Sequence, residues 1–241
     1  NKDMKSSYTV PFAQVYNQRW TGFVSKAGPQ IRALYEQRCS QGEHTLLDVC
    51  CGTGQLALQF LRAGYTVTGL DSSEPMLAHA RSNCLSFVSS GEAVFVQADA
   101  ADFALPSRFG LAVSTFDALN HLAGRQALQS CFVCVHRALF PDGMFVFDLN
   151  SVVGLRHWNN VTIEDAPDAM IVKRGMYDEE RRQGRIRMSG FVREDVGGWL
   201  RFDETFVENA WSVAEVTGDL FSAGFSAVYQ ARTSDLTTPC T

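Results

Sequence analysis

Short apolar segments alternate with amphipathic segments through the first two thirds of the chain. The apolar segments have the length of strands that are buried on both faces, and the segments between them carry apolar residues at helical spacing. Strands that alternate with helices indicate a parallel sheet covered on both faces. The pattern predicts strands at residues 45–50, 65–70, 93–98, 109–115 and 143–149, with helices at 54–63, 74–85 and 124–139.

Different patterns flank this alternating region. Residues 8–38 have helical spacing, and Pro29 is expected to open a second helix there, so we expect a helical lid. Residues 151–210 alternate polar and apolar positions, with strands expected at 169–177, 185–193 and 199–208 and a hairpin turn at Gly197-Gly198, which predicts an antiparallel β insertion. A helix over 213–223 and a sixth strand over 225–231 are expected to complete the chain.

These elements predict an α/β fold: a Rossmann-like, doubly wound, mostly parallel sheet with an N-terminal helical lid and an antiparallel β insertion after the fifth strand. A chain of 241 residues is long enough for one such domain with an insertion. The expected parts are residues 1–150 (lid and core), 151–210 (insertion, a platform for a substrate or a dimer) and 211–241 (last helix and strand of the core).

The stretch from Leu46 to Asp71 has the order of a nucleotide-binding unit. A buried strand runs into Gly52-Thr53-Gly54, a helix follows, and a second strand ends at Asp71. The glycines let a ligand approach the backbone, and a carboxylate after the second strand can accept both hydroxyls of a ribose. The same spacing also fits a nicotinamide dinucleotide, so an NAD(P)-dependent oxidoreductase is an alternative at this point.

A wider set of motifs is more specific. They lie at the ends of the first three strands: Asp48, then Asp71-Ser72-Ser73 with Met76, then Gln97-Ala98-Asp99-Ala100-Ala101-Asp102-Phe103. Together they resemble the class I S-adenosylmethionine-dependent methyltransferase family. Later segments are similar to the subgroup that acts on small molecules, including sugar and amine N-methyltransferases: residues 114–122, 139–143 and 145–150.

The resemblance implies S-adenosyl-L-methionine as the cofactor and a set of residues that hold it. The implied set is Asp48 with the turn Cys50, Cys51, Gly52, Thr53 and Gly54 for the methionine portion; Asp71, Ser72 and Met76 for the ribose and its surroundings; Asp99 and Ala100 for the adenine; and Ser114, Thr115 and Phe116 for the methionine amine and the methyl group. The structural alternatives are a helix N-cap for Asp71 and a turn cap for Asp99.

Three further residues are candidates for the reacting end of the site. The resemblance places His121 near the acceptor, where an imidazole can take a proton from an amine or hydroxyl as the methyl group arrives. Tyr16, with Trp20 one helical turn further on, would cover the sulfonium or stack on the acceptor. The structural alternatives are a histidine with satisfied hydrogen bonds and an aromatic stripe in the core.

Charge and cysteine content narrow the class of protein. The net charge of -5 argues against a nucleic acid as the main partner. The seven cysteines form no regular disulfide framework, which favours the cytoplasm. Cys131 and Cys134 lack the partners of a metal site, so no metal is expected. No apolar run has the length of a membrane span.

The sequence thus predicts an S-adenosylmethionine-dependent methyltransferase that transfers a methyl group to nitrogen or oxygen of a small-molecule acceptor. Such a transfer is an in-line displacement, in which the enzyme mainly holds the two reactants at attack distance. The acceptor, and the choice between nitrogen and oxygen, stay open. A catalytically silent cofactor-binding protein, whose insertion forms a homodimer, is a further alternative.

Overall fold

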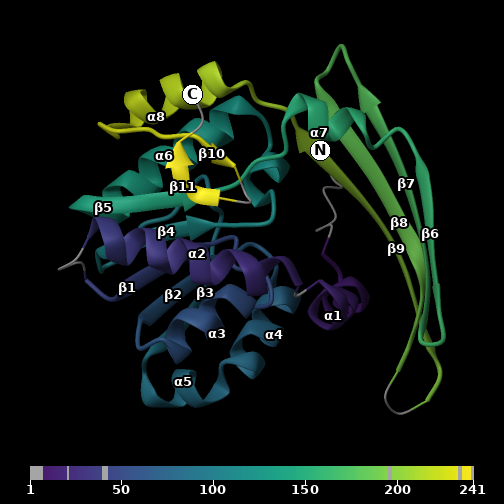
Figure 1. Ribbon diagram of the computed structural model, residues 1–241. Helices are drawn as coiled ribbons and strands as arrows, with labels where there is room; N and C mark the ends of the chain where they lie inside the picture. Colours follow the sequence, from purple (N-terminus) through teal and green to yellow (C-terminus); the bar gives the residue numbers. More distant parts are fainter. Residues whose placement is uncertain (1–7, 21, 40–42, 195–196, 233–234, 240–241) are drawn as a thin grey trace.

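The computed structural model describes residues 8–20, 22–39, 43–194, 197–232 and 235–239. Its centre is a five-stranded sheet in the order β3-β2-β1-β4-β5, with every pairing parallel. This sheet and its helices confirm the predicted fold class (Figure 1). The strands are β1 (Thr45–Val49), β2 (Thr66–Asp71), β3 (Ala93–Gln97), β4 (Phe109–Ser114) and β5 (Leu139–Phe147).

Helices cover both faces of the sheet. Leu46 of β1 packs in a cluster with α2, α3 and α4, whereas Leu47 packs with α6 and α8. Both leucines are fully buried, which explains why the strand is a continuous apolar run. No helix in the described part of the chain is long and apolar enough to cross a membrane. The helices are α2 (Gly22–Arg38), α3 (Gln55–Arg62), α4 (Glu74–Asn83), α5 (Leu85–Ser90), α6 (Arg125–Ala138) and α8 (Val213–Ala223).

The strand order creates a reversal point beside β1. The chain builds outward from β1 through β2 to β3, then crosses back to place β4 and β5 on the other side of β1. In open α/β sheets, ligands bind outside the carboxyl ends of the strands at such a reversal. The loops that follow Val49 of β1 and Ser114 of β4 therefore form the expected binding edge.

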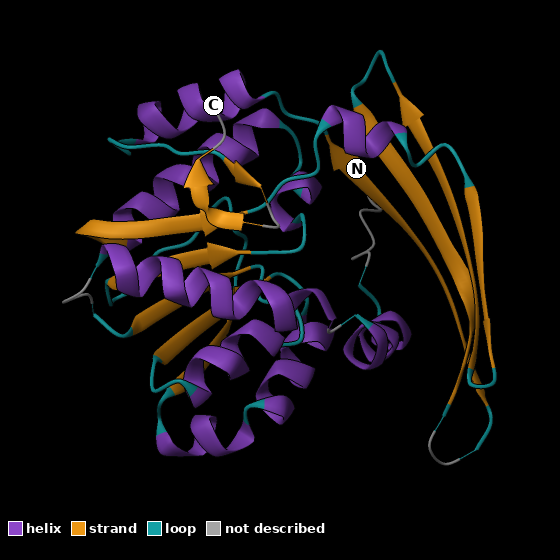
Figure 2. Cartoon of the chain, viewed as in Figure 1, coloured by secondary structure: helices purple, strands orange, loops and turns teal. Residues whose placement is uncertain are grey.

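The insertion is a separate antiparallel sheet in the order β6-β7-β8-β9 (Figure 2). The sequence predicted β7, β8, β9 and the turn at Gly197-Gly198, where both glycines have positive φ. It did not predict β6 or the short helix α7, because the residues of β6 are mostly exposed and lack a clear alternation. The elements are α7 (Val152–Arg156), β6 (Val161–Ala166), β7 (Ala169–Asp178), β8 (Gln183–Arg193) and β9 (Trp199–Asn209).

Helix α1 (Val10–Arg19) lies between the core and the insertion sheet (Figure 1). Phe12, only 3% exposed, packs among apolar residues of β7, β8 and β9, and its ring centroid lies 4.7 Å from that of Phe206. Arg19 extends the contact through ion pairs with Glu164 and with Asp168, the latter at 2.7 Å. The lid helix is therefore anchored on the insertion, and Oδ1 of Asn17 also ties it to the core by accepting a hydrogen bond from Asn83 at 2.7 Å.

Two sequence predictions near the ends of the chain are wrong. Pro29 does not open a helix but lies inside α2, which runs unbroken to Arg38. The predicted sixth strand at residues 225–231 is mostly irregular: only Ala231–Arg232 (β10) is extended, and it pairs with Asp235–Pro239 (β11) instead of the central sheet. The reason is that Phe225 packs its ring against His136 and Phe145, so the segment lies on the core as a side-chain contact.

The anchoring of α1 generates a stability prediction. Replacing Phe12 by alanine removes a buried ring from the cluster on the insertion sheet, so the free energy of unfolding should fall by about 3–5 kcal/mol. Val10→Ala changes a 65% exposed side chain of the same helix and should cost less than about 0.5 kcal/mol. Urea denaturation of both variants measures the difference; equal midpoints would contradict the anchoring.

Candidate active site

The loop after β1 is a tight turn with three residues in the left-handed region: Cys50 (φ 59), Gly52 (φ 53) and Gly54 (φ 73). No larger residue fits at Gly54, because its Cβ would clash with Cβ of Ala80 at 2.9 Å. A Cβ at Gly52 would meet no atom closer than 3.7 Å, so Gly52 is required for its backbone conformation. The turn leads directly into α3, whose first amide groups have no side-chain cap.

Asp71, at the end of β2, holds this turn in place. Its Oδ2 accepts a hydrogen bond from the Gly52 amide at 2.9 Å, and its Oδ1 accepts one from the Ser73 amide at 2.9 Å. Its carbonyl accepts from the Ala98 amide at 3.0 Å, so Asp99 follows closely beside it. Burial raises the pKa of Asp71. Each carboxylate oxygen keeps a lone pair for another donor.

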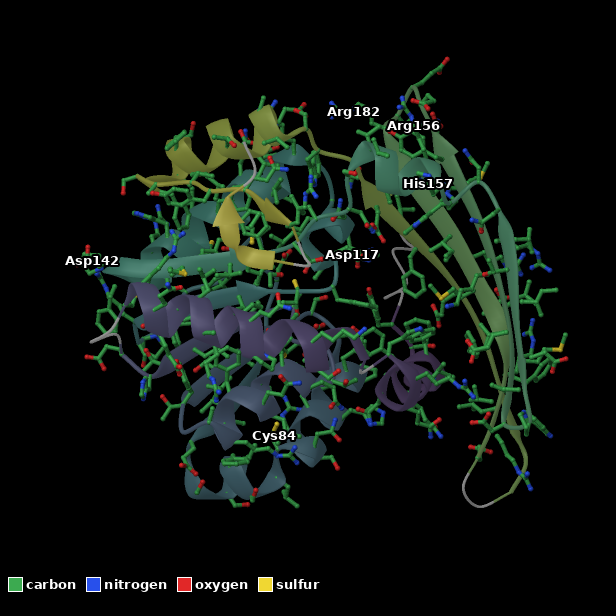
Figure 3. The ribbon with its side chains drawn as sticks, viewed as in Figure 1. Cys84, Asp117, Asp142, Arg156, His157 and Arg182 are labelled. Carbon is green, nitrogen blue, oxygen red and sulfur yellow. The ribbon has the colours of Figure 1, made fainter. Side chains whose placement is uncertain are left out.

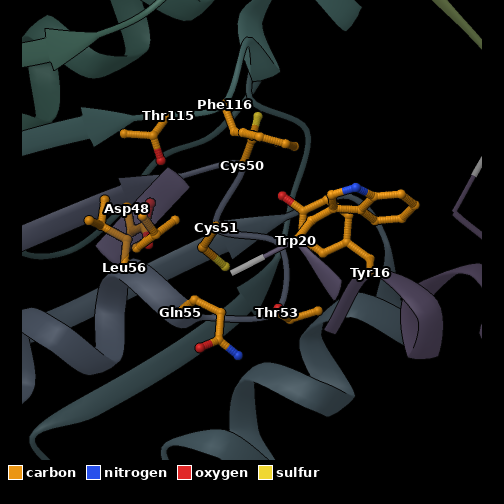
Figure 4. A pocket seen from close by; sticks show the side chains of 11 residues that line it. Tyr16, Trp20, Asp48, Cys50, Cys51, Thr53, Gln55, Leu56, Thr115 and Phe116 are labelled. Atoms are coloured by element: carbon orange, nitrogen blue, oxygen red, sulfur yellow. The ribbon is translucent and has the colours of Figure 1, made fainter. Parts of the chain in front are cut away.

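A pocket lies between the turn and the lid helices (Figure 4). It brings together eight of the sequence-predicted residues with three that the sequence did not single out. The predicted residues that line it are Tyr16, Trp20, Asp48, Cys50, Cys51, Thr53, Thr115 and Phe116, and the additional ones are Val24, Gln55 and Leu56.

Two buried polar atoms in the pocket wall lack partners among the described residues. They are Oδ2 of Asp48 and Oγ1 of Thr53, in side chains of residues only 2% and 1% exposed. Burial, with the nearby charge of Asp71, raises the pKa of Asp48 to about 8. Buried acceptors of this kind are costly unless a ligand or water donates to them. These acceptors suit a ligand with an ammonium group, and the turn suits a close approach of a ligand to the backbone.

The aromatic residues of α1 form one wall of the pocket. The Tyr16 ring lies 5.8 Å from the Trp20 ring and meets the Phe116 ring edge-on at 6.0 Å. Burial, with the charge of Asp117 as the next cause, raises the pKa of Tyr16, so its hydroxyl stays protonated and can donate. Both side chains therefore line the pocket.

The other predicted cofactor residues lie around this pocket without lining it. Met76 is buried beside the turn, and the exposed Ser72 accepts a hydrogen bond from Gln97 through its carbonyl. Asp99 is exposed and its Oδ1 caps its own turn by accepting from the Ala101 amide at 2.8 Å, the structural alternative for this residue. Ala100 is buried next to it. Ser114 is fully buried with an unpartnered hydroxyl.

A second cluster of polar side chains lies beyond Phe116. His121 ends the short helix η1 (Ala118–His121), and its Nε2 lies 3.6 Å from Oε1 of Glu208 on β9. One ligand atom each from Asp117, His121 and Glu208 lie within 4.8 Å of one another. Asp117 is central in the view with side chains, between the core and the insertion sheet (Figure 3).

Asparagine and aspartate side chains hold this second cluster together. Nδ2 of Asn150 donates both to Oδ2 of Asp117 at 2.6 Å and to Oε2 of Glu208 at 2.8 Å. Asp148 accepts from the amides of Phe116 and Asp117 at 2.7 and 2.9 Å, and so stabilises two residues with positive φ. The network joins loops after β4 and β5 to the insertion sheet.

The electrostatics of this cluster are unusual. Burial, with the charges of Glu208 and Asp148, raises the pKa of Asp117 to about 8. Burial also raises the pKa of Glu208 to about 7, and lowers the pKa of His121 to about 4. His121 is therefore neutral near pH 7 and supplies no counter-charge.

Sequence reasoning missed two residues of this region. Glu208 lies in the insertion, far from the family motifs, and only the folded chain brings it to His121. Tyr8 precedes α1: its carbonyl accepts from Oγ of Ser73 at 3.1 Å, and its ring meets His121 edge-on at 6.3 Å. Tyr8 thus connects the Asp71 turn to the second cluster. The pattern of strands and turns carried no signal for either contact.

Comparison with known proteins supports the same class. Residues 46–143 match the model of the methyltransferase domain family. A dTDP-3-amino-3,6-dideoxy-alpha-D-glucopyranose N,N-dimethyltransferase of Streptomyces fradiae is 34% identical over 116 residues, 48% of this chain and 43% of that protein. A dTDP-3-amino-3,4,6-trideoxy-alpha-D-glucopyranose N,N-dimethyltransferase of Streptomyces venezuelae is 30% identical over 145 residues, 58% of each chain.

The fold has solved counterparts. The crystal structure of an S-adenosylmethionine-dependent methyltransferase from Clostridium acetobutylicum superposes with a TM-score of 0.74 at 24% identity, covering 88% of this chain and 85% of that one. The doubly wound sheet, the glycine turn with its acidic partner and the matched domain support a class I S-adenosylmethionine-dependent methyltransferase. The nicotinamide alternative receives no support from these matches.

The raised pKa of Asp48 generates a prediction about stability and pH. The unfolded chain loses this proton near pH 4, whereas the folded protein keeps it until about pH 8, so folding stability falls as the pH rises through that window. The Asp48→Asn variant should lack this contribution, which amounts to at most about 1.4 kcal/mol per pH unit. Urea denaturation across the window, with Asp142→Asn as an exposed control, measures it; parallel curves for wild type and Asp48→Asn would contradict it.

Proposed function

We propose that this methyltransferase N-methylates an amine of a small, sugar-like acceptor. The observation that carries the cofactor half of the proposal is the Asp71 carboxylate, hydrogen-bonded to the Gly52 amide at the edge of a pocket with two unpartnered acceptors. The acceptor half draws on two N,N-dimethyltransferases of amino sugars, whose names state amine nitrogen as the methylated atom. The alternative is methylation of an oxygen, and a comparison of an amino sugar with glucose distinguishes the two.

The proposed roles of the cofactor-binding residues follow their positions. Asp71 accepts the ribose hydroxyls, while the amides of the turn and of α3 approach the methionine portion. Asp48 and Thr53 accept hydrogen bonds from its ammonium group. Met76, Ser72, Asp99 and Ala100 surround the adenosine, and Ser114, Thr115 and Phe116 border the methyl group.

When bound, S-adenosyl-L-methionine supplies an electrophilic methyl group on a sulfonium sulfur. The protein positions the two reactants and excludes water. It needs no nucleophilic side chain, because the acceptor itself attacks the methyl group. Tyr16 and Trp20 cover the pocket from α1 and exclude water. The neutral ring of His121 accepts a hydrogen bond from the acceptor and so orients its lone pair.

Two other expectations stay proposals. The cysteines that the structure describes carry free thiols, which supports a reducing compartment such as the cytoplasm. The outer face of the insertion exposes apolar side chains, among them Met170, Phe191 and Trp199, and this supports a homodimer built on that sheet.

Loss of the Asp71 carboxylate tests the cofactor site. Asp71→Ala removes the ribose acceptor and releases the Gly52 amide, so the affinity for S-adenosyl-L-methionine should fall about 10- to 100-fold by calorimetry. Asp142→Ala, at an exposed aspartate on the far edge of the sheet, should bind like the wild type (Figure 3). An unchanged dissociation constant for Asp71→Ala would overturn the assignment, and tight binding without transfer to any amine would favour a silent binding protein.

A further inference from the structure

We propose that Asp117 and Glu208 form the binding site for the protonated amine of the acceptor, and that this pair takes the proton which the amine must lose before it is methylated. The inference rests on the proposed function and deepens it. It assigns a role to a glutamate of the insertion and makes the acceptor a cation.

Glu208 is buried and only partly hydrogen-bonded. Its side chain is 3% exposed, and Nδ2 of Asn150 satisfies only its Oε2. Its Oε1 accepts no hydrogen bond from any described residue and faces Nε2 of His121 at 3.6 Å. A buried, partly unpartnered carboxylate that points into a cluster of acceptors indicates a missing donor.

Three carboxylates lie together in this cluster. Asp117, Asp148 and Glu208 come from the loop after β4, the loop after β5 and strand β9, and none of them forms an ion pair with a described lysine or arginine. Like charges held close together in a buried place prefer to keep a proton between them or to bind a cation. A cationic ligand therefore stabilises this arrangement.

Three acceptor atoms of the cluster lie close enough together to bind one ammonium group. A primary alkylammonium has three N–H donors, and Asp117, His121 and Glu208 each offer one acceptor atom within 4.8 Å of the others. Acceptors placed about 2.9 Å from one tetrahedral nitrogen are separated by roughly 4.7 Å. The acceptors of the cluster are no further apart than 4.8 Å, and one pair is 3.6 Å apart, so one ammonium group can reach all three. Mg²⁺ prefers oxygen ligands at about 2.0–2.1 Å in octahedral geometry, which a histidine in this set does not match.

The cluster lies next to the proposed cofactor pocket. Asp117 directly follows Phe116, whose side chain lines the cofactor pocket. From the other side, Tyr8 links the two regions, since its carbonyl bonds Ser73 beside Asp71 and its ring contacts His121. An amine held by the cluster would therefore lie next to the pocket in which the methyl donor is proposed to bind.

The proton transfer balances within these groups. The N–H bond of the alkylammonium breaks, its electron pair stays on nitrogen, and an O–H bond forms on a carboxylate of the pair. The ammonium becomes a neutral amine with a free lone pair, while the pair becomes less negative by one charge. The pKa values of Asp117 (about 8) and Glu208 (about 7) are raised. They are therefore closer to the pKa of an alkylammonium than the pKa of an ordinary carboxylate is, which favours the proton transfer.

The test compares an amine with the matching alcohol. The probes are 3-amino-3-deoxyglucose and glucose, titrated by calorimetry into protein loaded with S-adenosylhomocysteine at pH 7. The wild type should bind the amino sugar about 10- to 100-fold more tightly than glucose, because charge-assisted hydrogen bonds carry the difference. Equal affinities, or binding of neither sugar, would overturn the inference.

Variants assign the preference to the proposed residues. Glu208→Gln keeps the shape and an acceptor for Asn150 but loses the charge, so the preference for the amino sugar should disappear; Asp117→Asn should act in the same direction. Glu204→Gln is the matched control: it is a buried glutamate on the same face of β9, and it bonds Thr9 instead of the cluster. A preserved preference in Glu208→Gln would overturn the assignment.

A pH profile and a metal control complete the test. In the wild type, kcat/KM for the amino sugar should rise as the pH rises through about 7, and Glu208→Gln should shift or remove that rise. The titratable groups that face Glu208 are Asp117, Asp148 and His121, so the profile reports the cluster as a unit. Activity that EDTA abolishes and Mg²⁺ or Mn²⁺ restores would instead assign the cluster to a metal.

Failure of this inference differs from failure of the proposed function. If the wild type does not bind S-adenosylhomocysteine, the proposed cofactor site is wrong. If it binds S-adenosylhomocysteine normally while Glu208→Gln retains the amine preference, only the role of the pair is wrong.

Discussion

One interaction fixes the geometry on which the site depends: a carboxylate at the end of a strand that holds a left-handed turn. Asp71 does so after β2 by accepting from the Gly52 and Ser73 amides. Asp148 repeats the arrangement after β5 by accepting from the Phe116 and Asp117 amides. Asp148 offsets the strain of two non-glycine residues at positive φ, and both aspartates hold the backbone at the carboxyl edge of the sheet in one conformation. The first turn frames the pocket, and the second aims Asp117 at the insertion.

The insertion sheet adds residues to the region at the carboxyl edge of the parallel sheet. Its strand β9 supplies Glu208, and the same sheet anchors α1, which brings Tyr16 and Trp20 over the pocket. The insertion sheet thus packs against the lid helix and meets the core across the polar network of Asn150.

The sequence was informative where physical rules are local. Apolar runs located the five parallel strands, and the glycines with Asp71 located the pocket, because turns and buried strands restrict residue types within a few positions. It was not informative where contacts span the chain. Glu208 and Tyr8 reach His121 only through folding. The prediction of a strand at 225–231 was wrong, and there too a contact between distant residues matters, because Phe225 packs its ring against Phe145. Asp99 showed the turn cap that its residue type also permits.

The central claim is that Asp71, Asp48 and the turn between them hold an adenosyl sulfonium beside the acidic cluster. A crystal structure with S-adenosylhomocysteine tests this most directly. The account predicts ribose hydroxyls within hydrogen-bond distance of the Asp71 carboxylate, the amino-acid ammonium at Oδ2 of Asp48, and the sulfur directed toward Asp117 and Glu208. A ligand bound away from Asp71, or with its sulfur turned from that cluster, would contradict it.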